Sequence, residues 1–199
     1  MRIRCIKLYQ VSLPMKEGAY SWSTQSFAAF DSTVVKVETD EGIDGIGEIC
    51  PLGPAYLPAY AEGARTGIVT MAPGLIGLDP RQIGAINLAM DRLLKGHPYV
   101  KSALDIACWD ILGKVTGQPA YTLLGGLQQD RVRLFKVVSR ADPDVMAERL
   151  DAYQAQGFRQ FQMKVGADPD TDIERIRKVV ARLRPGNRLA ADANCGWRQ

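Results

Sequence analysis

The chain has 199 residues, of which 46% are hydrophobic and 24% charged, so it can bury the core of one or two domains. Its formal net charge is only +3 and the two signs are mixed along the sequence, which argues against nucleic acid as a partner. No apolar stretch is long enough for a signal peptide or a membrane span, and we expect a cytoplasmic protein with no membrane partner. Four cysteines without CxxC spacing and a single histidine predict reduced, mostly buried thiols instead of a zinc site or a disulfide framework.

The first part of the sequence predicts a small antiparallel sheet followed by helices. Residues 2–13 alternate loosely between apolar and polar, which is typical of a strand, and a polar loop with Tyr20 and Trp22 follows. Two strand-like runs at 33–39 and 44–49, separated by turn residues, predict a hairpin. The expected helices span 58–70, 79–95 and 100–114. We therefore expect an α+β domain over residues 1–125, ending at Gly125-Gly126.

From residue 126 the pattern changes to alternating strands and helices. The expected order is strand 132–138, helix 144–156, strand 159–165, helix 170–183 and strand 188–193. The strands recur about every 28 residues, which is typical of βα units in a parallel sheet or barrel. Residues 126–199 are therefore expected to form the first units of a (β/α)8 barrel that this chain does not close.

Lys164 lies at the end of the second barrel-like strand. Because side chains alternate along a strand, Gln162 and Lys164 share one face, while Phe161 and Met163 share the other. We expect the apolar pair to pack against the outer helices and to leave Lys164 inside the barrel.

Asp192 stands at the matching place on the next strand, on a face that it is expected to share with Asn194. Barrel enzymes keep their catalytic residues at the carboxyl ends of parallel strands, so a lysine beside a carboxylate there is a candidate base beside a candidate metal ligand. Taken alone, a lysine at a strand end is more often a solvated charge, and an aspartate after a strand is more often a turn or cap residue. Their matched depth on neighbouring strands favours a site.

With these motifs the sequence resembles the mandelate racemase and muconate lactonizing enzyme group of the enolase superfamily. The resemblance covers the whole chain, and its most specific part is the long helix with the glycines that follow it. Ala103 and Ala107 in that helix lie one turn apart, which predicts close helix packing in any fold. The matching segments are 102–114, Pro119, 123–126, Gln162-Met163-Lys164 and Asp192-Ala193-Asn194.

The resemblance implies a role for each residue at the strand ends. Lys164 matches the acid/base lysine, and Asp192 matches the first of three carboxylate ligands to Mg2+. Gln162 stands where the family often has another lysine, which argues against members that need two lysines on this strand. Asn194 matches a polar position that supports the metal ligand or contacts the substrate. The other two carboxylates and the opposing acid/base group would lie beyond residue 199.

The implied reaction removes the proton α to a carboxylate through an enediolate, and it ends in racemisation, epimerisation or dehydration. Such a proton is very weakly acidic, so a divalent ion must hold the developing charge while a base accepts the proton. Mg2+ suits carboxylate oxygens, and its charge near Lys164 would disfavour the ammonium form.

By the same resemblance, loops 18–22 and 51–56 are expected to close over the substrate. They supply Tyr20, Trp22 and Tyr56 but no lysine or arginine, which fits a compact, partly apolar or cationic carboxylate, although the rings could equally serve only to cover the barrel mouth. The loop at 50–56 resembles members that act on proline betaines and hydroxyprolines. Sugar-acid dehydratase, muconate-type cycloisomerase and dipeptide epimerase are alternatives within the family.

Two readings from other classes stay open. Lys164 could form a Schiff base in a metal-free lyase, although the neighbouring Asp192 favours a metal. The 199-residue chain by itself could also be inactive and act only by association through its unpaired strand edge. We expect the chain alone to be inactive, and the complete enzyme to be a homo-oligomer that acts on a small-molecule carboxylate.

Overall fold

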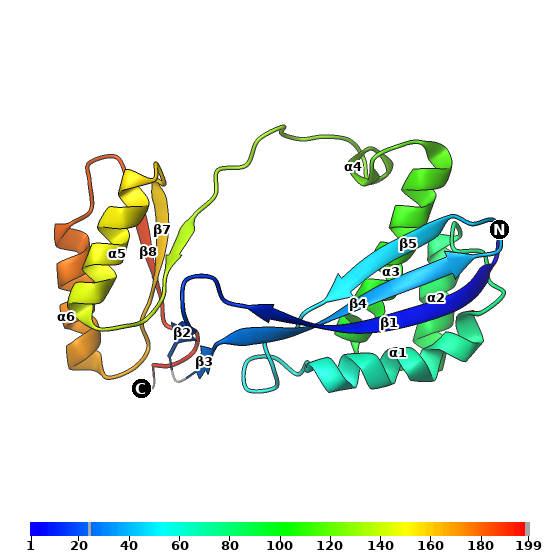
Figure 1. Cartoon of the computed structure of the whole chain (residues 1–199), viewed down its shortest axis with the longest axis horizontal. Helices are drawn as coiled ribbons and strands as arrows, with labels where there is room; N and C mark the ends of the chain where they lie inside the picture. Colours follow the sequence, from blue (N-terminus) through cyan, green and yellow to red (C-terminus); the bar gives the residue numbers. More distant parts are fainter. Residues whose placement is uncertain (24, 198–199) are drawn as a thin grey trace. The chain divides into compact units, whose positions relative to one another are not determined.

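The structure is a computed structural model that describes residues 1–23 and 25–197 (Figure 1). The chain divides into two compact units, each with its own buried apolar core. The first unit consists of Met1–Leu13 and Phe30–Gln128, and the second of Pro14–Ala29 and Gln129–Gln199. None of the helices in the described residues is both long and apolar enough to cross a membrane.

The first unit contains a three-stranded sheet with the order β1-β4-β5. Strand β4 pairs antiparallel with β5, and β1 runs opposite to β4 (Figure 1). A turn with Gly42 at φ +77° joins β4 to β5. The sequence prediction of an antiparallel sheet is confirmed. The strands are β1 (Ile3–Pro14), β4 (Ala29–Thr39) and β5 (Asp44–Ile49).

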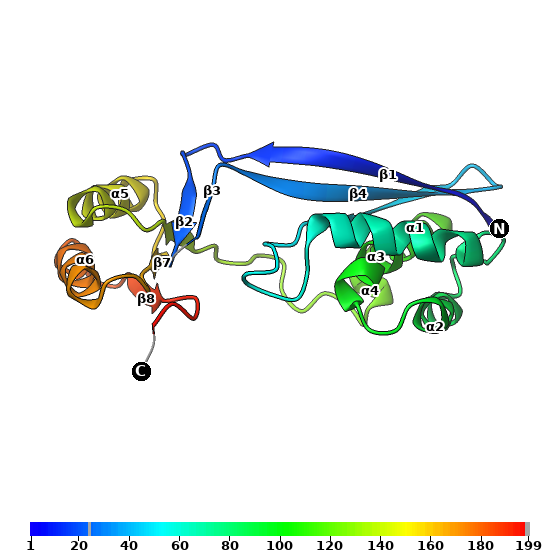
Figure 2. The same cartoon turned by 90° about the horizontal axis from the view of Figure 1, so that it is seen from below.

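Helices cover one face of this sheet, as Figure 2 shows. They are α1 (Ala61–Leu75), α2 (Ile83–Leu93), α3 (Pro98–Thr116) and the short α4 (Ala120–Leu123). Helix α2 begins later than the sequence predicts. The Asp79 carboxylate accepts the Arg81 backbone N–H at 3.0 Å and pairs with its guanidinium, so residues 79–82 form a turn before the helix.

Helix α3 lies directly on the backbone of β5. A Cβ atom at Gly45 would lie 2.0 Å from the Ala107 carbonyl oxygen, and one at Gly47 would lie 1.9 Å from that of Ala103. Both alanines are fully buried. The close packing predicted from the alanine spacing is confirmed, and the sheet side of the contact is made by glycines.

The second unit contains three parallel strands in the order β6-β7-β8 with two connecting helices. Strand β6 is shorter than predicted, because pairing with β7 begins only at Lys136. Both helices begin as the sequence predicts, with the side chains of Asp142 and Asp168 accepting N–H groups of the first turn and a proline following each. The elements are β6 (Lys136–Val138), α5 (Pro143–Ala155), β7 (Gln160–Lys164), α6 (Pro169–Ala181) and β8 (Arg188–Asp192).

Two further sequence expectations were wrong. The segment with Tyr20 and Trp22 is not a loop but a hairpin of β2 (Tyr20–Trp22) and β3 (Gln25–Phe27). The buried Trp22 ring stabilises this pairing, because it stacks on the Phe27 ring with 4.8 Å between the ring centroids. The thiols are not mostly buried: Cys108 is, but Cys195 is exposed and the other two are half-buried.

Candidate functional site

The side chains of Lys164 and Asp192 meet at the carboxyl ends of β7 and β8. The two residues are direct partners in the parallel register, and Lys164 Nζ lies 2.7 Å from Asp192 Oδ2. Lys164 is only 4% exposed, whereas the Asp192 side chain is 29% exposed. The opposite face of β7 carries Phe161 and Met163, which are buried in the core beside α5 and α6. The predicted alternation along β7 is therefore confirmed.

Both oxygens of the Asp192 carboxylate accept hydrogen bonds. The Gln162 side-chain amide donates to Oδ2 at 3.0 Å, beside Lys164, and the Asn194 backbone N–H donates to Oδ1 at 2.9 Å. Burial acts to raise the pKa of Asp192, but the hydrogen bonds from Lys164 and Asn194 outweigh it and hold that pKa below its ordinary value. The group is therefore an ionised carboxylate at neutral pH.

Asn194 does not share the strand face of Asp192, which corrects the sequence expectation. The strand ends at Asp192, and residues 193–196 form a tight turn in which the Gly196 N–H donates to the Ala193 carbonyl at 2.8 Å. Asn194 and Cys195 both have positive φ, +44° and +61°, as in a type I′ turn. The hydrogen bond from Asn194 to Asp192 is donated by the Asn194 backbone.

The β2-β3 hairpin is attached to the ends of all three parallel strands. Arg140 N–H donates to the Ser21 carbonyl at 3.0 Å, and Ser23 N–H donates to the Val165 carbonyl at 3.3 Å. The Ser23 hydroxyl donates to the Ala193 carbonyl. These bonds place the hairpin on the loops that follow Lys164 and Asp192. Sequence reasoning missed Ser23, because a serine in a polar segment carries no distinctive signal.

A second anchor holds the beginning of the same segment. The Glu17 carboxylate accepts hydrogen bonds from Lys136 Nζ at 2.7 Å and from the Tyr153 hydroxyl at 2.6 Å. Burial, and then the bond to Glu17, raise the pKa of Tyr153 to about 12. The phenol therefore stays protonated and continues to donate at neutral pH.

The three aromatic residues expected at the substrate differ in their surroundings. Trp22 is 2% exposed and its ring lies 5.1 Å from that of Tyr20, so its face is occupied by other side chains of the same hairpin. Tyr20 is half-buried on β2. Tyr56 belongs to the first unit and is 39% exposed. A substrate role for any of them stays a prediction.

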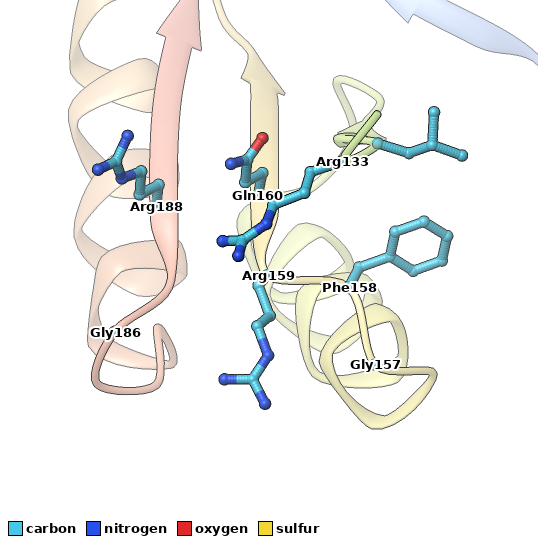
Figure 3. A pocket seen from close by; sticks show the side chains of 8 residues that line it. Arg133, Gly157, Phe158, Arg159, Gln160, Gly186 and Arg188 are labelled. Carbon is cyan, nitrogen blue, oxygen red and sulfur yellow. The ribbon is translucent and has the colours of Figure 1, made fainter. Parts of the chain in front are cut away.

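A cavity of about 730 Å³ opens at the other end of the strands, where β7 and β8 begin (Figure 3). Its lining includes Arg133, Arg159 and Arg188. Barrel enzymes place catalytic groups at the carboxyl ends, so the candidate site is identified by Lys164 and Asp192 and not by the size of this cavity.

Comparison with known proteins agrees with this geometry. Residues 5–125 match the family described as the mandelate racemase/muconate lactonizing enzyme N-terminal domain, and residues 145–199 match the enolase C-terminal domain-like family. The chain belongs to the mandelate racemase/muconate lactonizing enzyme family. The resemblance and the fold class inferred from the sequence are confirmed: a capping domain is followed by the first strands of a (β/α)8 barrel.

Relatives in this family span different reactions. The chain is 54% identical to a cis-3-hydroxy-L-proline dehydratase of Roseibium aggregatum, over 99% of this chain and 54% of the relative. It is 38% identical to an N-succinyl-L-Arg/Lys racemase of Bacillus cereus, over 100% of this chain and 53% of the relative. It thus spans about half the length of these relatives.

Among solved structures, a mandelate racemase/muconate lactonizing enzyme from Roseovarius nubinhibens ISM in complex with magnesium superimposes with a TM-score of 0.90. It is 36% identical, and the match covers 99% of this chain and 54% of that one.

Magnesium is the metal that this family implies, and Asp192 fits it as one ligand. Mg2+ prefers oxygen ligands, and Asp192 supplies an ionised, partly exposed carboxylate at the end of a strand. Within residues 1–23 and 25–197, no three histidine, cysteine, aspartate or glutamate side chains gather closely enough to hold a metal ion together. The described residues therefore contain no complete set of three such ligands.

Two residues beside the site were missed by sequence reasoning. Asp172 and Arg175 on α6 form a buried ion pair, with Arg175 Nη1 2.8 Å from Asp172 Oδ1. Charged residues three positions apart are ordinary on a solvated helix face, so their spacing gave no signal.

Proposed function

We propose that this chain is part of a Mg2+-dependent enzyme that removes the proton α to the carboxylate of an amino-acid-derived substrate. The product would be the racemised or epimerised acid, or the dehydrated one. The observation that carries the proposal is the Lys164–Asp192 pair, which joins a buried amine to an ionised carboxylate at the carboxyl ends of adjacent barrel strands. Relatives named as dehydratases and racemases support the same reaction classes.

Asp192 would hold the metal ion as one of its ligands. The ion, when bound, supplies positive charge that stabilises the negative charge on the substrate's carboxylate oxygens. Gln162 donates to Asp192 Oδ2 and so fixes the orientation of the carboxylate.

Lys164 is the proposed base. Its amine nitrogen takes the α-proton from one face of the substrate and must be neutral to do so. Burial of the amine excludes water from the nitrogen, which strengthens the electrostatic interactions at the site.

For the substrate, we propose a hydroxyproline or a proline betaine. The 54% identity to a cis-3-hydroxy-L-proline dehydratase supports the former, and the absence of lysine and arginine from segments 18–22 and 51–56 fits a small substrate without a second acid group. The ring of Tyr20, which is half-buried on β2, would attract a ring ammonium group, and substrate contacts of Trp22 and Tyr56 stay predictions. The division into a capping domain at 1–125 and barrel units at 126–199, a cytoplasmic location and a homo-oligomeric enzyme stay predictions.

Exchange of the α-proton with solvent tests the function. The complete enzyme is incubated with Mg2+ and cis-3-hydroxy-L-proline or proline betaine in D2O, and deuterium uptake is followed by NMR. Lys164→Ala is expected to lower exchange from one face by about 10²-fold to 10⁴-fold, the usual contribution of a general base. Lys178→Ala is the matched control, because Lys178 lies on α6 in the same unit with its side chain 37% exposed.

Full exchange in Lys164→Ala would rule out the proposed base. An equal loss of exchange in Lys164→Ala and Lys178→Ala would show that the effect is not specific to Lys164. Borohydride reduction in the presence of candidate ketones distinguishes the metal-free Schiff-base lyase from the Mg2+-dependent enzyme, since only a Schiff base at Lys164 would be trapped covalently.

A further inference from the structure

The buried ion pair of Asp172 and Arg175 lies where the loops after the three parallel strands converge. Asp172 is 2% exposed and Arg175 is 8% exposed. Burial acts to raise the pKa of Asp172, but hydrogen bonds from the Gly166 N–H, Arg175 and Trp197 outweigh it and keep that pKa below its ordinary value. Asp172 is therefore a buried, ionised carboxylate.

One oxygen of this carboxylate connects two loops. Asp172 Oδ2 accepts the backbone N–H of Gly166 at 2.8 Å and of Ala167 at 2.9 Å, both in the loop after β7. It also accepts the Trp197 indole N–H at 3.2 Å, from the segment after β8. Through Arg175 the network reaches the loop after β6, because Arg175 Nε donates to the Ala141 carbonyl at 2.8 Å.

The two loops held by Asp172 are the ones that carry the candidate site. Gly166 follows Lys164 by two residues, and Trp197 follows Asp192 by five. The loops also touch through their backbones: a Cβ atom at Gly166 would lie 2.3 Å from the Ala193 carbonyl oxygen, and one at Gly196 would lie 2.3 Å from the Gly166 carbonyl oxygen. Displacement of either loop would therefore displace the other, and with it the end of a strand.

Stability alone does not explain a charged pair at this place. Taking two charges out of water costs several kcal/mol, and well-packed apolar side chains of similar volume often give equal or greater stability. Apolar side chains cannot, however, hold three N–H donors from two loops at fixed positions around one oxygen. The pair is thus suited to fixing geometry.

We propose that Asp172 is a positioning residue, assisted by Arg175, that sets the separation of the Lys164 amine and the Asp192 carboxylate by clamping the loops after β7 and β8. Its effect on turnover rests on the proposed function. Asp172 touches neither Lys164 nor Asp192 in any contact that the structure shows, so it acts through the loop backbones.

Asp172→Asn in the complete enzyme is the direct test, because the amide keeps the shape of the side chain but loses the charge that faces Arg175. Asp168→Asn is the matched control. Asp168 lies in the loop after β7 and caps α6, because its Oδ2 accepts the Thr171 backbone N–H at an N to O distance of 2.9 Å. The structure shows no contact of Asp168 with Trp197. Two measurements are made: the kinetics of α-proton exchange, as kcat and KM, and the Lys164 Nζ to Asp192 Oδ2 distance in metal-free crystals.

We expect Asp172→Asn to lower kcat by about 10-fold to 100-fold with KM changed less than about 3-fold, since small misplacement of catalytic groups costs rate more than binding. The Nζ to Oδ2 distance should rise from 2.7 Å to beyond hydrogen-bonding range. Asp168→Asn should leave both quantities at the wild-type values. Trp197→Phe removes a single donor and should give the same changes to a smaller degree, so it carries the test if Asp172→Asn fails to fold.

An unchanged distance together with wild-type kcat in Asp172→Asn would overturn the inference. Equal losses in Asp168→Asn would also overturn it, because the effect would then belong to the start of α6 and not to the clamp. If Lys164→Ala retains exchange, the proposed function fails. The Lys164 Nζ to Asp192 Oδ2 distance, compared between crystals of the wild type and of Asp172→Asn, still decides whether Asp172 positions these two side chains.

Discussion

Replacing Gly47 with alanine tests the contact between α3 and β5, on which the first unit is built. The added Cβ would lie 1.9 Å from the Ala103 carbonyl oxygen, whereas ordinary contacts of this kind begin near 3.4 Å. The helix would have to retreat by about 1.5 Å at this point. The obstacle is helix backbone, so no flexible side chain can turn aside to relieve it.

The cost follows from this geometry. Overpacking a buried contact usually costs about 1 to 3 kcal/mol, and a backbone obstacle places Gly47→Ala near or above the upper limit. Gly84→Ala is the matched control, since Gly84 lies in α2 with nothing within 4 Å of an added Cβ and no positive φ. There the same substitution should raise the free energy of unfolding by about 0.4 to 1 kcal/mol, because it restricts the unfolded chain.

Urea unfolding followed by far-UV circular dichroism compares the two variants with the wild type. Hydrogen exchange of peptides from α3 then reports whether the loss is local to that helix. We expect Gly47→Ala to unfold at lower urea concentration and to lose protection in α3, and Gly84→Ala to unfold at the same or higher concentration. A wild-type unfolding midpoint for Gly47→Ala, or an equal loss in Gly84→Ala, would refute the close-contact argument.

Three further outcomes are expected. Asp192→Asn should weaken Mg2+ binding by the complete enzyme about 10-fold or more in calorimetric titration, since a charged ligand is lost; unchanged affinity would remove Asp192 from the metal site. A polypeptide of these 199 residues alone should bind Mg2+ only weakly and turn over no substrate, because its described residues gather no three side chains that could hold a metal ion together; a stoichiometric micromolar site abolished by Asp192→Ala would contradict this. The contribution of Tyr153 to stability should be fully present below about pH 10 and be lost as the pH rises towards 12, since its folded pKa is raised to about 12. The free energy of unfolding, measured from pH 9 to 12, should lose this pH dependence in Tyr153→Phe. The same pH dependence in the variant and the wild type would contradict the assignment to Tyr153.

Features that depend on local periodicity were predictable. The parallel strands recur at a regular spacing, and alternation along β7 places Lys164 on one face and Met163 on the other. Helix starts at Asp142 and Asp168 follow from an acceptor side chain that precedes a proline. The juxtaposition of Lys164 with Asp192 then follows from the rule that parallel strands end at one edge of the sheet, which requires no knowledge of side-chain packing.

The sequence by itself therefore predicted the order of the longer strands and helices, the family and the residue pair of the candidate site. The tertiary structure alone decided the β2-β3 hairpin, whose Ser23 bonds to residues more than 140 positions away, and the clamp of Asp172, which joins two separate loops. It also decided why Gly47 must be glycine, since the obstacle comes from α3. These features arise from contacts between segments distant in the sequence, and the residues that make them follow no local period.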